Sequence, residues 1–181
     1  MSSRGFSTAQ RVIDLANAVR VRPELPREEV TALLARHGER PEDLAPDAFS
    51  AADLRELRDA ALRMADLLAE PDPDLAAQAL NAVLAEHAVA PRLSRHDGHS
   101  WHLHADREGA GWGEWFLASS ALALAQLLTE HGRPPWGECA AADCRTLHLR
   151  TGPGSPRRYC SPACASRTRV AAHRRRGGVS R

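Results

Sequence analysis

The sequence predicts a mainly α-helical protein with one small β-hairpin in its N-terminal domain and a small cysteine-held module, a short hairpin plus a helix, at its C-terminal end. Three observations lead to this prediction. Apolar residues recur at helical spacing through most of the first two thirds of the chain, all four cysteines lie in the last quarter, and the composition changes at Arg133-Pro134-Pro135. We therefore expect a helical domain over residues 1–132 and a second domain over residues 133–181.

Four helices are predicted before residue 90. A capping box of Ser7 and Gln10 predicts the start of the first, whose apolar positions 12, 15, 16 and 19 share one face. The second helix is expected to begin at Pro26 and end at Gly38. Ser50 is expected to be the N-cap of the third helix, and Asp72 and Pro73 the N-cap and first residue of the fourth.

The pattern becomes alternating in PRLSRHDGHSWHLHAD, residues 91–106, and Asp97-Gly98 at its centre predicts a hairpin. Its histidines are His96, His99, His102 and His104. A metal site is one interpretation. A polar sheet face is favoured, because the histidines have no cysteine or carboxylate partner in this pattern. A fifth helix, from about Trp112 to His131, is apolar nearly all round and is expected at the centre of the core.

The cysteines form two close pairs, Cys139 with Cys144 and Cys160 with Cys164, separated by fifteen residues. This pattern is typical of a four-thiolate zinc site, because each pair supplies two ligands and the intervening chain folds back to join them. Four thiolates fill the coordination shell, so we predict one Zn²⁺ with a structural role. Four unrelated thiols, a disulfide, or His148 or His173 as a substitute ligand are the alternatives.

Ser161-Pro162 predicts a helix from Pro162 to about Arg176, which places Cys164 in its first turn. The segment TLHLRTGPGSPRRY, residues 146–159, is expected to form a strand, a Gly-Pro-Gly turn and a return strand. These elements together make a treble-clef-like zinc finger. Val170 and Ala171 are expected to face the cysteines.

Charge is divided unevenly along the chain. Residues up to Gly132 include 13 arginines and 21 acidic residues, whereas the rest include 11 arginines and two acidic residues. A basic end of this kind indicates a polyanionic partner, and arginine forks match phosphate oxygens and guanine edges. We predict binding to duplex DNA, with a solvated charged face or a disordered basic tail as the alternatives. The predicted contacts are Arg157, Arg158, Arg167, Arg169, Arg174, Arg175 and Arg176.

The segment CAAADC, followed by the segment RRYCSPACASRTRVAAHRRR, resembles the CGNR zinc-finger family. IDLANAV, with Asn17, and LRELRDAAL resemble the ABATE domain that precedes this finger in stress-induced transcription regulators. The resemblance implies a transcription regulator whose finger binds DNA and whose helical domain senses a signal or contacts a partner. The Gly-Asn-Arg that follows the family's last cysteine is Ala165-Ser166-Arg167 here, so only the arginine is retained.

Several other function classes find no support in the sequence. It contains no nucleophile elbow, P-loop, dinucleotide fingerprint or HExxH motif, so we expect no enzyme activity. The longest apolar run is too short to cross a bilayer, so we expect no membrane contact and a cytoplasmic location. A single small finger is expected to need a homodimer for specific DNA binding. An RNA-binding or protein-interaction module, and a thiol redox switch, are the alternatives. The sequence does not determine whether the helical domain binds a small-molecule effector.

Overall fold

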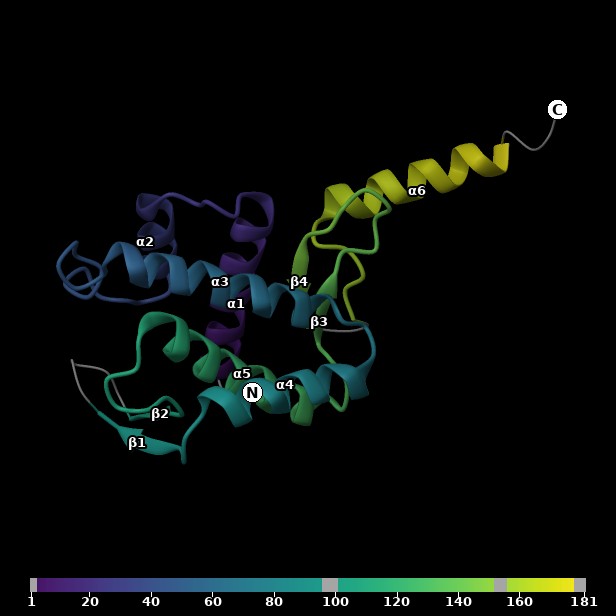
Figure 1. The fold of residues 1–181 in the computed structure, drawn as a ribbon. Coiled ribbons are helices and arrows are strands. Elements are labelled where there is room, and N and C mark those ends of the chain that lie inside the picture. The colour runs from purple at the N-terminus through teal and green to yellow at the C-terminus, as the bar shows by residue number, and fades with distance from the viewer. Residues whose placement is uncertain (1–2, 96–100, 152–155, 178–181) are drawn as a thin grey trace.

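The computed structural model of the protein describes residues 3–95, 101–151 and 156–177 (Figure 1). It is mainly helical and contains two separate two-stranded antiparallel sheets, which confirms the predicted fold class. The helices are α1 (Ser3–Val21), α2 (Arg27–Arg36), α3 (Ala51–Ala69), α4 (Pro73–His87), α5 (Trp112–His131) and α6 (Pro162–Gly177). The strands are β1 (Arg92–Ser94), β2 (His102–His104), β3 (Trp136–Glu138) and β4 (Leu147–Leu149).

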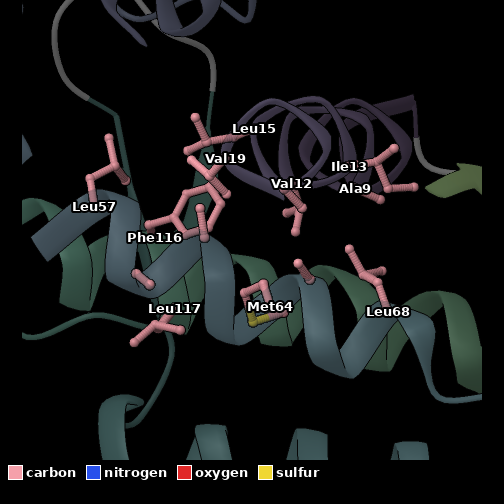
Figure 2. Packing of buried hydrophobic residues seen from close by; sticks show 14 of the residues in the cluster. Ala9, Val12, Ile13, Leu15, Val19, Leu57, Met64, Leu68, Phe116 and Leu117 are labelled. Atoms are coloured by element: carbon pink, nitrogen blue, oxygen red, sulfur yellow. The ribbon is translucent and has the colours of Figure 1, made fainter. Parts of the chain in front are cut away.

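Helix α5 is the centre of the core, as predicted from its nearly uniform apolar character. Helices α1, α3 and α4 all pack against it. Val12 of α1, Met64 of α3 and Phe116 of α5 are fully buried together in the close view of Figure 2. The burial of each such side chain stabilises the folded state by about 1.5–3 kcal/mol. Within the described residues, no helix is both long enough and apolar enough to cross a membrane.

Local capping signals correctly predicted most helix ends. Ser50 and Asp53 form a reciprocal capping box at the start of α3, and the Asp72 carboxylate accepts from two backbone N–H groups at the start of α4. Gly132 ends α5 in the left-handed conformation, with φ of 66°, where a side chain would be strained.

The capping box predicted at Ser7 and Gln10 was wrong. Helix α1 already begins at Ser3, so Ser7 lies inside it, and the Gln10 amide donates to Asp14 at 2.8 Å. Phe6 packs against the core one residue before the predicted cap. Its burial accounts for a helix that extends beyond the local capping signal, because packing supplies more free energy than one cap.

The first hairpin pairs β1 with β2, and Leu93 lies opposite Leu103. Its predicted turn at Asp97-Gly98, with His96 and His99, falls outside the described residues. The expectation that these histidines lack a carboxylate partner was wrong, because His104 Nδ1 lies 3.0 Å from Asp106 Oδ1. Residues two apart in extended chain point to the same side, which brings Asp106 beside His104.

The second hairpin differs from the prediction in the identity of one strand. Strand β4 pairs with β3, which precedes the first cysteine, and residues 157–159 form no strand. Trp136 on β3 and Leu149 on β4 are opposite each other and both are buried, whereas Arg157 and Arg158 are exposed. Burial of apolar surface therefore favours β3 as the partner. The predicted Gly-Pro-Gly turn lies outside the described residues.

Candidate metal centre

Two short structural elements bring the four cysteines together. Cys139 directly follows β3, and Cys144 lies in the turn that leads to β4. Cys160 directly precedes α6, and Cys164 lies in its first turn. All four Sγ atoms lie within 4.8 Å of one another, and this is the only group of potential metal ligands that meets in the described part of the chain.

The distances between sulfur atoms fit a tetrahedral zinc ion. Cys160 Sγ lies 3.7 Å from Cys144 Sγ and 3.6 Å from Cys164 Sγ. Zn–S bonds of about 2.3 Å in a regular tetrahedron place the sulfur atoms about 3.8 Å apart. These two distances therefore match the spacing of a four-thiolate site, and the remaining sulfur pairs lie within 4.8 Å. Four ligands leave no open position for a substrate, which makes the site structural.

Hydrogen bonds hold the cysteines in these positions. The Cys139 N–H donates to the Thr146 carbonyl at 2.9 Å, which joins the first cysteine to the chain before β4. The Cys160 N–H points to Cys139 Sγ at 3.4 Å, and the Cys164 N–H donates to the Ser161 hydroxyl at 3.3 Å. The Ser161 contact confirms the predicted cap on the first turn of α6.

Comparison with known protein families agrees with this geometry. Residues 136–177 match the CGNR zinc finger. Residues 9–131 match ABATE, the family described as "Putative stress-induced transcription regulator". The chain belongs to the ABATE family. No curated protein matches the chain. The CGNR match and the sulfur cluster together establish one structural zinc ion, and His148 is not among the ligand atoms that meet in this cluster.

The thiols of the CGNR finger differ in acidity. Hydrogen bonds with the Thr146 side chain and backbone lower the pKa of Cys144 to about 6. Burial and the neighbouring sulfur atoms raise the pKa of Cys160 to about 12. The Cys144 thiol therefore ionises more readily than the Cys160 thiol, because it lies beside Thr146, a residue that the sequence pattern did not single out. A zinc ion binds all four as thiolates, and its positive charge supplies the stabilisation that burial removes.

Arg167 offsets part of the negative charge at the site. Its Nη2 donates to Cys164 Sγ at 3.1 Å. Four thiolates and one Zn²⁺ leave a net charge of −2, so a guanidinium in contact with sulfur is stabilising. Arg167 is the residue that this finger retains from the family's Gly-Asn-Arg motif.

The hairpin of the CGNR finger is attached to the ABATE helices. The Asn17 side chain of α1 donates to the Leu147 carbonyl at 2.9 Å and accepts from the Leu147 N–H at 2.8 Å. Arg20, one turn further along α1, donates to Glu138 at 2.5 Å and to the Arg145 carbonyl at 3.0 Å. These contacts were not predicted. The only indication of them in the sequence was Asn17, a polar residue within the otherwise mostly apolar segment IDLANAV.

Core packing continues from the ABATE helices into the same hairpin. The side chains of Trp136, Leu147 and Leu149 are buried in the cluster formed by α1, α3 and α5. The four cysteines lie beyond this hairpin in a small cluster of their own, together with Ala141 and Tyr159. The hairpin is therefore the structural link between the helical core and the metal centre.

The arginines predicted to contact DNA lie on α6 and in the segment before it. Arg157, Arg158, Arg167, Arg169, Arg174 and Arg175 are exposed, and Arg176 lies on α6. Figure 1 shows α6 extending away from the helical body, with its first turn at the zinc finger. Val170 and Ala171 are exposed, so the expectation that they face the cysteines was wrong. The reason is that α6 leaves the cysteine cluster after about one turn.

Proposed function

We propose that the protein is a DNA-binding transcription regulator in which the zinc ion fixes one end of α6 and the arginines of α6 contact the backbone of duplex DNA. The proposal rests on one observation: the first turn of α6 is anchored at the cysteines, and the charged residues of the rest of the helix are all basic. Helix α6 contains no acidic residue, and Arg169, Arg174 and Arg175 are exposed along it. A helix held in one orientation presents its cations at set positions, as phosphate and groove contacts require.

The charge distribution supports a polyanionic partner. The residues up to Gly132 carry an excess of eight negative charges, and those from Arg133 onward carry an excess of nine positive charges. A negative body repels a phosphate backbone while the basic end attracts it, so the finger approaches DNA first. The role of the ABATE helices in this proposal is to sense a signal or to contact a protein partner, and no catalytic step is involved.

Duplex DNA is favoured over single strands by the scarcity of aromatic residues. Tyr159 is the only aromatic side chain after Trp136. Single-strand binders usually stack successive bases on several aromatic rings. A symmetric duplex site would recruit two copies of the chain, and size-exclusion chromatography of the protein–DNA complex measures this directly.

The test is a salt titration of DNA binding with variant proteins. Replacing Arg174, Arg175 and Arg176 with Ala removes three cations from α6 without touching the cysteines. Each phosphate contact adds about 0.9 to the slope of log K against log salt concentration, so the triple variant should lose a slope of about 2.7 and bind more weakly. The control replaces Arg36, Arg55 and Arg95 with Ala, which removes the same charge from exposed positions of the ABATE domain.

Fluorescence anisotropy with a labelled duplex provides the measurement, with structured RNA and single-stranded DNA as competitors. Equal affinity and slope for the α6 variant and the wild type would contradict the proposal. Stronger competition by RNA than by duplex DNA would assign the basic helix to RNA instead. Zinc content measured in the same samples establishes that each variant retains its finger.

A further inference from the structure

A pocket in the ABATE domain lies far in the sequence from the zinc finger. It has a volume of about 370 Å³ and lies between the segment around residues 39–48, residues 104–110 and the first turn of α5. This volume is within the range of small-molecule sites, about 300–1,000 Å³. Trp112 and Trp115 of α5 line it, together with charged residues from the two segments.

Aromatic rings form one wall of the pocket. The rings of Trp112 and Trp115 meet edge to face at 5.3 Å, and Trp112 meets Phe49 in the same way at 5.0 Å. The guanidinium of Arg11 already lies over the Trp115 ring, at 4.2 Å from its centroid. Indole faces attract cations through their quadrupole, and the contact between Arg11 and Trp115 is an example of this interaction within the protein.

Carboxylates outnumber guanidiniums around the pocket. The charged residues that line it are Glu39, Asp43, Asp106 and Glu108 on the acidic side and Arg92 and Arg107 on the basic side. Three of these residues are already in ion pairs, Glu39 with Arg11, Asp43 with Arg40 and Arg107 with Glu114, and Arg40 also pairs with Glu42. With these partners the set contains six carboxylates and four guanidiniums, so its net charge is negative and favours a cationic ligand.

Asp106 is the residue best placed to bind such a cation. Asp106 is only 7% exposed, yet it lines the pocket. Its Oδ1 lies 3.0 Å from His104 Nδ1. A carboxylate that lines the pocket attracts a cation, and an ammonium group placed beside it would form a charge-assisted hydrogen bond.

We propose that this pocket binds a small monovalent organic cation, an amine or quaternary ammonium with an apolar body. The cationic group lies at Asp106 and the apolar body lies against Trp112. The proposal is independent of DNA binding, and its test contains no DNA.

The probe is benzyltrimethylammonium, added to the zinc-loaded full-length protein at pH 8, above the usual titration range of histidine. Benzyl alcohol and benzoate serve as neutral and anionic comparisons of similar size. Isothermal titration calorimetry should give an affinity for the cation about tenfold or more above that for benzyl alcohol, with no binding of benzoate. Equal affinities for the cation and the alcohol would overturn the proposal.

Variants locate the site. Asp106→Asn should weaken binding of benzyltrimethylammonium by about tenfold, whereas Glu130→Gln, an exposed change of the same charge at the far end of α5, should leave it unchanged. An equal loss in both variants would show a diffuse electrostatic effect and refute the assignment. If Asp106→Asn fails to fold, Trp112→Leu decides the question: retention of full affinity for the cation would exclude the tryptophan wall.

Discussion

The contact of Asn17 with Leu147 allows a quantitative test of the link between the ABATE helices and the finger. In the β3–β4 ladder the Cys139 N–H donates to Thr146 and the Arg150 N–H donates to Pro135, so the peptide groups of Leu147 face outward. The Asn17 amide pairs with both, as a third strand would. Asn17→Ala leaves this N–H and C=O unpaired in a partly buried position, which costs about 1–2 kcal/mol for each group. We therefore expect the free energy of unfolding to fall by about 2–4 kcal/mol.

The measurement is urea unfolding of the zinc-loaded protein, together with the rate of zinc transfer to a chelator. Asn81→Ala on the exposed face of α4 is the matched control, because both changes gain the same helix propensity and only one removes contacts to Leu147. Zinc should leave the Asn17→Ala variant faster, because the hairpin that carries Cys139 and Cys144 is no longer fixed to α1. A free energy of unfolding within about 0.5 kcal/mol of that of Asn81→Ala would refute this reasoning.

Two further predictions concern the metal centre and the core helices. Cys160→Ser should abolish stoichiometric zinc binding and reduce the helical circular dichroism signal, because α6 loses its anchor. The control variant Ser166→Ala should change neither quantity. If Cys160→Ser still binds one zinc ion per chain, the Cys160 thiol is not a ligand. Ser50→Ala should lower the free energy of unfolding by about 1 kcal/mol. A double-mutant cycle with Asp53→Ala should show coupling, and strictly additive effects would contradict the reciprocal capping box.

Features encoded in a few adjacent residues were predictable. Ser50 and Asp72 cap their helices through hydrogen bonds that span at most three residues, and Gly132 ends α5 because glycine alone adopts a positive φ without strain. The cysteine spacing predicted the metal centre for a similar reason, since each pair supplies its ligands from one turn of chain.

Features that depend on distant surfaces were not predictable. The partner of β4 was mistaken because residues 157–159 and β3 both lie within reach of it, and only the helical core decides which one can bury its side chains. The direction of α6 was also missed, since Val170 and Ala171 have no apolar surface beside them once the helix leaves the cysteine cluster.

The helical content, the cysteine cluster and the basic end of this protein can be predicted from its sequence, because periodicity, spacing and charge are properties of neighbouring residues. The burial of the finger's hairpin among the ABATE helices, and its attachment through Asn17 and Arg20, emerge only in the folded chain. Those contacts join residues more than a hundred positions apart. Their formation depends on which apolar surfaces bury each other as the chain collapses, and no local pattern records that choice.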